Sequence, residues 1–336
     1  MARIIAFCMF VVLFSGCVTT GPPVYRGEIY QAQEELKAKA LKYKLGKEKE
    51  VADVGYRLLK ALPAGKGCFP YLGIRFVEVD KYVKEMLNLN NTYGIAAAYV
   101  VSGSPADKSG IQAGDIIKNI NNYIIYRERD LKNALRYVKP NQKVKFRIER
   151  NNEAKEITVV MADVPLEVRF RMLDEESVNA GASPGQVVVT YGLMRFIQSD
   201  DELAVILGHE LAHIVRGHIG KRTGTDLASV LLGITAGYGV ESISPGSGDI
   251  VMRGISGAFS SLYSREFERE ADYFGIIYTY HAGFNIEAGI DVWERFAIEV
   301  PKSMTRDFFS THPTSTERLL RIKKIVKEIK EGKVGN

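Results

Sequence analysis

Cysteine is scarce in this chain, with three among 336 residues. Cys8 lies inside an apolar N-terminal segment, Cys17 directly follows that segment, and Cys68 is the third. If the segment is removed and Cys17 is modified, only Cys68 keeps a free thiol. The mature chain then forms no internal disulfide, and its fold depends on a hydrophobic core, for which 46% hydrophobic residues are ample.

Charge of one sign is not in large excess, and no basic block stands out. The chain has 45 Lys and Arg against 40 Asp and Glu, a formal net charge of +5. The densest basic run, residues 321–333, alternates with apolar residues and two glutamates, which favours a solvated helix face. We therefore expect no nucleic-acid partner.

Long hydrophobic runs are also missing. The N-terminal run has about ten apolar residues and a second run, which begins near Thr225, has about 16, whereas a helix that spans a bilayer needs about 20. The segment 225–250 is first apolar and then rich in Gly and Ser. It is interpreted as a lid over a cleft, as a patch that contacts a membrane or a partner, or as a buried helix followed by a loop.

The N-terminus has the features of a secretory signal: one arginine, an apolar run and a pair of small residues before Cys17. Its end, LFSGC, resembles a lipobox, where bacterial signal peptidase cuts before a cysteine that then carries lipid; Phe14 stands where Leu is usual. The resemblance implies a lipid anchor on Cys17 at the periplasmic face of the bacterial cell envelope. Val18 favours the outer membrane over the inner one. An ordinary cleaved signal is the alternative.

Periodicity and composition divide the rest of the chain and predict an α+β fold with two domains. The segments are a tether at 18–27, helices at 28–66, a β-rich unit at 71–163 and a mixed, mainly helical part at 164–333. Gly46 is a plausible break in the first helical segment. A hairpin is expected around Asn151 and Asn152, which separate two runs of alternating polarity.

The β-rich unit contains GSPADKSGIQAGDIIKNINN at 103–122. This stretch is similar to the PDZ domains of bacterial envelope proteases. The resemblance implies that Leu72, Gly73 and Ile74 form a loop whose N–H groups bind the C-terminal carboxylate of a peptide, while the peptide pairs with the adjacent strand. A PDZ fold that serves only as a spacer is the alternative.

Three of the five histidines lie within ten residues, in the stretch AVILGHELAHIVRGH. Ser199 and Glu202 form a capping-box pattern that predicts a helix start just before it. On this helix His209 and His213 are four residues apart and project from one face, so their imidazoles can bind one Zn²⁺. Glu210 is then placed to take a proton from the attacking water, as in zinc hydrolases.

A third ligand is required, and two residues are considered. His218 lies five residues after His213, about 140° further round a helix, which predicts a surface or capping role. Glu268 and Asp272 share one face of a second predicted helix, LYSREFEREADYFG. Glu268 would complete the site, and Asp272 would accept a hydrogen bond from a ligand imidazole. A solvated helix of alternating charge is the alternative for this segment.

Four motifs, in this order, resemble the zinc metallopeptidases that include the CAAX prenyl protease, HtpX and BepA. They are NAGASPG at 179–185, DELAVILGHELAHIVRGH at 201–218, SREFEREAD at 264–272 and STHPTSTERL at 310–319. The resemblance implies a mainly helical, zincin-like metallopeptidase domain with a small edge-stranded sheet, and it places the third ligand on Glu268. It also assigns residues 51–62 to that domain, so that the PDZ unit is an insertion.

The same resemblance implies roles for four further residues. Asn179 and Ala180 lead into an edge strand that would bind the substrate. His312 lies near the zinc, where it either assists catalysis or acts as a fourth ligand that holds the site closed. Arg318 faces the transition-state oxyanion or pairs with carboxylates of the site.

Together these features predict a membrane-anchored endopeptidase with one Zn²⁺ per chain. Its substrates would be unfolded or misassembled envelope proteins, held extended along the edge strand near SPGQVVVTY, while the PDZ domain presents C-terminal tails or regulates access. The alternative is a periplasmic chaperone or assembly factor for outer-membrane proteins, with a mostly closed zinc site. The presence of Glu210 and of all three ligands favours the enzyme.

Overall fold

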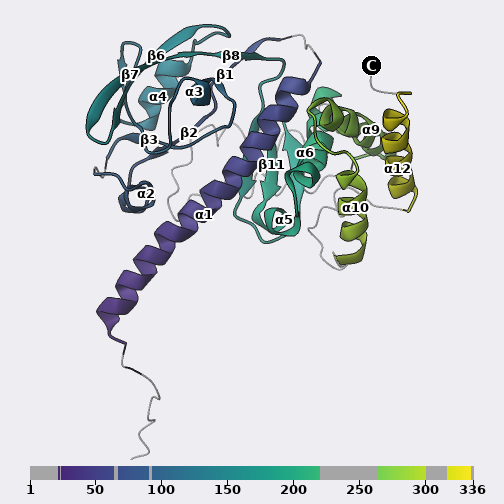
Figure 1. Cartoon of the computed structure of the whole chain (residues 1–336), viewed down its shortest axis with the longest axis horizontal. Helices are drawn as coiled ribbons and strands as arrows, with labels where there is room; N and C mark the ends of the chain where they lie inside the picture. Colours follow the sequence, from purple (N-terminus) through teal and green to yellow (C-terminus); the bar gives the residue numbers. More distant parts are fainter. Residues whose placement is uncertain are drawn as a thin grey trace, which may run out of the picture.

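The structure is a computed structural model, and the residues that it describes are 22, 24–63, 67–90, 93–219, 263–299 and 316–333. It has a long helix α1, a β-rich part and a mainly helical C-terminal part (Figure 1). The mixture of helices and strands confirms the α+β class.

Helix α1 spans Arg26–Ala61 without interruption, so the predicted break at Gly46 is wrong. A Cβ on Gly46 would contact nothing within 4 Å, and one exposed glycine costs a helix only about 1 kcal/mol. Burial of Leu58 and its neighbours on the C-terminal half offsets that cost. The helix ends at Leu62, which is extended because Pro63 follows it. None of the described helices, α1 included, is long and apolar enough to cross a membrane.

The β-rich part is one antiparallel sheet in the order β2-β3-β4-β6-β7, with β5 beside β4. Its elements are β2 Ile74–Glu78, α2 Lys81–Leu87, β3 Ile95–Val100, α3 Pro105–Lys108, β4 Ile116–Ile120, β5 Tyr123–Ile124, α4 Glu128–Leu135, β6 Lys143–Arg150 and β7 Glu153–Val160. Asn151 and Asn152 have φ values of 54° and 65°, as a tight hairpin turn requires, so the predicted hairpin is confirmed. Among the described strands, β2 has a neighbour on one side only.

The two ends of the β-rich part lie side by side. Strand β1 (Phe69–Tyr71) pairs antiparallel with β8 (Ala162–Val164). The chain therefore enters and leaves this part at one place.

Strand β3 of this sheet is buried on both faces. Strand β3 reads IAAAYV and all six of its residues are buried. Ile95 and Ala97 pack into the core that includes α4, whereas Ala96 and Ala98 join the core that includes α1 and the C-terminal part. Because both faces of β3 are covered by a core, its residues do not alternate between polar and apolar, which explains the continuous apolar run.

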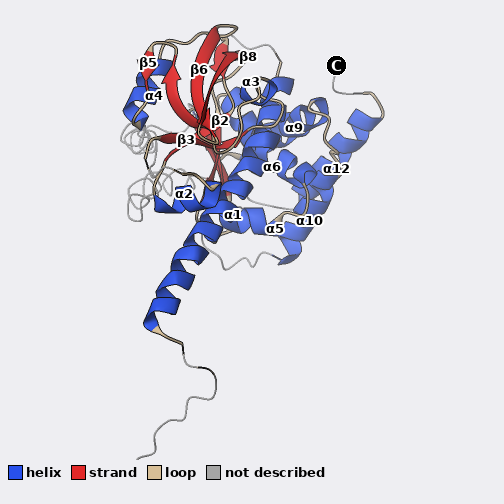
Figure 2. Cartoon of the chain, turned by 60° about the vertical axis from the view of Figure 1, so that its left-hand side comes forward, coloured by secondary structure: helices blue, strands red, loops and turns tan. Residues whose placement is uncertain are grey.

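The C-terminal part combines a three-stranded sheet with helices (Figure 2). Its elements are β9 Arg169–Leu173, β10 Ala180–Ser183, β11 Gln186–Thr190, α5 Tyr191–Phe196, α6 Asp200–Val215, α9 Arg265–His281, α10 Ala288–Glu299 and α12 Thr316–Lys330. Strand β11 is central, antiparallel to β10 and parallel to β9. Among the described strands β10 lies at the edge, so SPGQVVVTY itself contains the central strand, not the edge strand.

Helix α1 joins the two parts. It packs against α2 and β3 of the β-rich part and against β9, α6 and α9 of the C-terminal part. Glu48 of α1 is buried between two arginines: its Oε1 lies 3.6 Å from Arg75 Nε on β2 and 3.3 Å from Arg171 Nε on β9. One hydrophobic core and one buried charge cluster therefore connect both parts.

Candidate metal centre

Helix α6 carries the predicted metal-binding histidines. It begins at Ser199, whose Oγ accepts a hydrogen bond from the Glu202 N–H at 3.2 Å. The predicted reciprocal bond to Ser199 is wrong, because the Glu202 carboxylate accepts from the Gln198 N–H at 2.8 Å and pairs with Arg295 of α10. All residues from 202 to 213 are buried, so α6 is a core helix with contacts on every side.

Helices α6 and α9 cross in backbone contact. A Cβ on Gly275 would lie 2.8 Å from His209 Cα, and a Cβ on Gly208 would lie 2.7 Å from the Gly275 carbonyl oxygen. Thr279 lies at the same crossing and donates to the Gly275 carbonyl at 2.8 Å. The absence of side chains at both glycines therefore lets Glu268 of α9 reach the histidines of α6.

The donor atoms of His209, His213 and Glu268 converge and lie within 4.8 Å of one another. The two Nε2 atoms are 3.1 Å apart, and each lies 3.5 Å from a carboxylate oxygen of Glu268. Tetrahedral zinc holds its nitrogen ligands at about 2.0–2.1 Å, which places neighbouring ligand atoms about 3.3 Å apart. These residues therefore fit a zinc ion in both donor type and spacing.

The second ring nitrogen of His209 is held by Asp272, whose Oδ1 lies 3.0 Å from His209 Nδ1. Arg318 of α12 donates to both Asp272 oxygens at 2.8 and 2.7 Å, and its Nη1 lies 3.1 Å from Glu268 Oε2. Burial opposes ionisation of Asp272, but the Arg318 charge and the His209 hydrogen bond outweigh it and lower the Asp272 pKa. The Arg318 guanidinium also lies 4.3 Å from the centre of the Trp293 ring.

His218 does not have the predicted surface or capping role. Helix α6 ends at Val215, and Gly217 has φ +70°, which turns the chain back over the last helical turn. His218 is therefore fully buried, and its Nδ1 lies 3.1 Å from His213 Nδ1. Its Nε2 lies 2.9 Å from Glu270 Oε2. Sequence reasoning missed His218 and Glu270 as part of this site, although Gly217 signals the helix end.

Glu270 reaches this arrangement from α9 and also contacts Arg216. The Arg216 Nε donates to Glu270 Oε1 at 2.5 Å. The hydrogen bond from His218 lowers the pKa of Glu270 more than burial raises it, and Arg216 lowers it further. Each histidine of α6 is therefore linked to a carboxylate that pairs with an arginine. His209 contacts Asp272 directly, and His213 is linked to Glu270 through His218.

The model of peptidase family M48 matches residues 148–326, more than half of the chain. The chain belongs to peptidase family M48. A PDZ domain model matches residues 70–161, which confirms the second resemblance. The two matches overlap at residues 148–161, where the structure has the β6–β7 hairpin of the PDZ sheet.

Three curated relatives cover parts of this M48 chain. Metalloprotease YcaL of Escherichia coli is 31% identical over 160 residues, which is 46% of this chain and 61% of that protein. Mitochondrial metalloendopeptidase OMA1 of Saccharomyces cerevisiae is 31% identical over 160 residues, 44% of this chain and 43% of that protein. Probable periplasmic serine endoprotease DegP-like of Hahella chejuensis is 34% identical over 95 residues, 28% of this chain and 20% of that protein. The chain therefore spans less than two thirds of each relative.

Three further residues expected at the M48 site are described by the structure: Glu210, Asn179 and Ala180. Glu210 follows His209 on α6 and is fully buried. Asn179 directly precedes β10 and Ala180 is its first residue, and β10 packs against α6. Asn179 exchanges hydrogen bonds with Thr190: its N–H donates to Thr190 Oγ1 at 2.9 Å, and its carbonyl accepts from the Thr190 N–H at 2.9 Å. Asn179 therefore fixes the start of the edge strand against β11.

The expected carboxylate-binding loop lies in the PDZ domain and not at the metal centre. Gly73 has φ +85°, and a Cβ there would lie 2.2 Å from Ser104 Cβ, so only glycine fits. The Leu72 and Gly73 carbonyls accept from the N–H groups of Ala106 and Val101 at 3.1 and 2.9 Å. Ile74 then begins β2. The loop is thus fixed at the start of β2, an edge strand among those that the structure describes.

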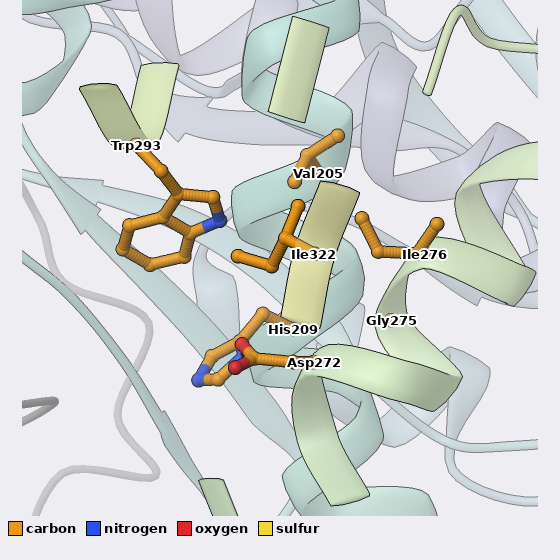
Figure 3. A pocket seen from close by; sticks show the side chains of 7 residues that line it. All are labelled: Val205, His209, Asp272, Gly275, Ile276, Trp293 and Ile322. Atoms are coloured by element: carbon orange, nitrogen blue, oxygen red, sulfur yellow. The ribbon is translucent and has the colours of Figure 1, made fainter. Parts of the chain in front are cut away.

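A small hollow lies beside His209 and Asp272 (Figure 3). Its lining comes from α6, α9, α10 and α12: Val205, His209, Asp272, Gly275, Ile276, Trp293 and Ile322. Most of these groups are apolar. The buried His209–Asp272 pair therefore lies against hydrocarbon, which shields its hydrogen bond from water.

Three sequence-based predictions fall outside the described residues. They concern the role of His312, the lipid on Cys17 and the lid at 225–250. These three stay predictions.

Proposed function

We propose that the chain is a zinc-dependent endopeptidase that uses His209, His213 and Glu268 as metal ligands. The observation that supports this most directly is the convergence of their donor atoms within 4.8 Å, beside a buried Glu210, in a chain of family M48. Zinc held there would supply a Lewis acid that polarises the scissile carbonyl and makes water acidic enough to lose a proton near neutral pH.

The chain's own residues then move the protons and hold the geometry. Glu210 takes the proton of the attacking water and later gives it to the leaving amine. Asp272 holds His209 in one tautomer. Arg318 neutralises Asp272 and Glu268, since it contacts both carboxylates, and so keeps them in place. His312 is retained as the oxyanion donor on the sequence resemblance alone.

The proposed substrates are extended polypeptides, chiefly unfolded or misassembled envelope proteins. Two strands that have a partner on one side only, among the strands that the structure describes, support this choice: β10, which packs against α6, and β2 in the PDZ domain. A substrate added to either edge gains backbone hydrogen bonds with little demand on its sequence. Leu72, Gly73 and Ile74 would bind the C-terminal carboxylate of a substrate tail at the second edge.

The proposed location is the periplasmic side of the outer membrane, with the lipid on Cys17 as anchor. The lipobox resemblance supports the anchor, and similarity over 95 residues to a protein named as periplasmic supports the compartment. Incorporation of labelled palmitate into the wild type, but not into Cys17→Ser, is the expected result in bacterial cells. Equal labelling of both proteins would contradict the anchor.

Digestion of casein by purified protein tests the proposed activity. Wild type should cleave it, zinc-stripped protein should not, and restored zinc should recover the rate. Cleavage that continues after the zinc is removed would contradict the metallopeptidase assignment. Bound zinc without cleavage would favour the chaperone alternative, in which the site is mostly closed.

A further inference from the structure

We infer that His218 and Glu270 position the ligand His213, through a chain of hydrogen bonds that fixes which ring nitrogen faces the metal. The inference rests on the proposed zinc site. It gives His218 a positioning role in metal binding that its place in the sequence does not suggest.

The chain of hydrogen bonds has one consistent assignment of protons. His213 directs Nε2 toward His209 and Glu268, so a neutral His213 that binds metal carries its proton on Nδ1. That proton is donated to His218 Nδ1, which lies 3.1 Å away and must therefore be the acceptor. His218 then carries its own proton on Nε2 and donates it to Glu270 Oε2 at 2.9 Å. Glu270 can only accept, so it sets the direction of the whole chain.

The two ligand histidines are thus held in parallel ways. His209 donates directly to a carboxylate, Asp272, whereas His213 reaches its carboxylate, Glu270, through the ring of His218. Both carboxylates come from α9, the helix that also supplies Glu268. A single helix therefore provides one ligand and orients the other two.

Packing holds both rings of this chain in place. The His213 ring stacks on Tyr263 with centroids 3.7 Å apart, and the His218 ring stacks on Phe267 with centroids 4.4 Å apart. A phenylalanine at position 218 can keep the stacking but has no ring nitrogen. His218→Phe therefore separates the hydrogen-bonding role from the packing role.

The experiment measures the zinc dissociation constant of purified protein by competition with a chromophoric chelator. The variants are His218→Phe, His218→Asn, whose amide can replace the acceptor near Nδ1, and Glu270→Ala, which removes the terminal carboxylate. His281→Phe is the matched control, because His281 is exposed at the end of α9. The melting temperature of each zinc-free protein reports on folding, and the visible spectrum of the cobalt-loaded protein reports on ligand geometry.

We expect His218→Phe and Glu270→Ala to weaken zinc binding by about 10–100-fold, as loss of groups that orient metal ligands typically does. His218→Asn should recover part of this loss, and His281→Phe should match the wild type. The cobalt spectrum should change for His218→Phe and should match the wild type for His281→Phe.

Zinc binding by His218→Phe and Glu270→Ala within twofold of the wild type would overturn the inference. If His218→Phe lowers the melting temperature of the zinc-free protein, Glu270→Ala decides, because the Glu270 side chain is 30% exposed and its loss leaves the core intact. Casein cleavage is measured separately, so an inactive wild type that binds zinc contradicts the proposed activity and leaves this test unaffected. A wild type that binds no zinc contradicts both.

Discussion

At the scale of single residues, Gly275 sets the distance between the two helices that supply the metal ligands. A methyl group there would press on the His209 backbone at 2.8 Å, where nothing can rotate away. We predict that Gly275→Ala destabilises the protein by about 1–3 kcal/mol in urea denaturation, despite the better helix propensity of alanine. Zinc binding should also weaken, because Glu268 moves away from the histidines.

Gly46→Ala is the matched control for this prediction. Gly46 also lies inside a helix, but its added Cβ would contact nothing within 4 Å. Alanine should therefore stabilise the protein by roughly 0.5–1 kcal/mol. Equal free-energy changes for the two substitutions would contradict the close packing of α6 on α9.

Residue spacing made the two histidines of the metal cluster predictable, because His209 and His213 lie inside a regular helix, whereas Glu268 was placed by the resemblance to a known family. His218 was misjudged, since the helical period of 100° per residue applies only up to Val215. Beyond that residue Gly217 reverses the chain and directs His218 inward. A periodicity argument cannot be extended past the end of its element.

At the scale of elements, the β6–β7 hairpin depends on two consecutive left-handed residues. Asn151 has φ 54°, a conformation that costs most other residues about 1 kcal/mol or more. We predict that Asn151→Ala destabilises the protein by about 1 kcal/mol, whereas Asn151→Gly does not, as measured by the midpoint of urea denaturation. A loss of the same size for glycine and alanine would mean that the asparagine side chain, and not the backbone, determines the turn.

Local patterns predicted this hairpin because its turn and its alternation are contiguous in sequence. The position of β11 was not predictable in the same way. Whether a strand lies at the edge or the centre depends on pairing with distant residues, here those of β9. The continuity of α1 through Gly46 likewise depends on its packing against both parts of the molecule.

At the scale of the whole molecule, the shared core predicts that the PDZ domain and the peptidase part unfold together. Glu48 lies buried between Arg75 and Arg171, which belong to the two parts. Glu48→Ala removes the buried carboxylate that lies between both arginines and should cost roughly 3–5 kcal/mol. Fluorescence of Trp293, the only tryptophan, and far-UV circular dichroism should give one shared midpoint before and after the change.

Lys44→Ala is the control at this scale. Lys44 of α1 pairs with Asp174, but these side chains are 38% and 65% exposed, so the pair contributes only about 0–1 kcal/mol. A dichroism transition that separates from the Trp293 transition would show that the two parts unfold independently. The sequence predicts that the α1 segment is helical. It does not predict that α1 packs against both domains, because that packing forms only when both domains are folded.

Zinc content and casein cleavage of Glu210→Gln, measured together, test most directly whether Glu210 acts as the base of a zinc peptidase. Glutamine keeps the shape of Glu210 but cannot take a proton, and Glu210 is not one of the three proposed ligands. This variant should bind one zinc per chain, as the wild type does, and should lose cleavage by a factor of about 100 or more, in line with the roughly 10²–10⁴-fold contribution of a general base. Cleavage at the wild-type rate by a zinc-loaded Glu210→Gln protein would contradict the central claim.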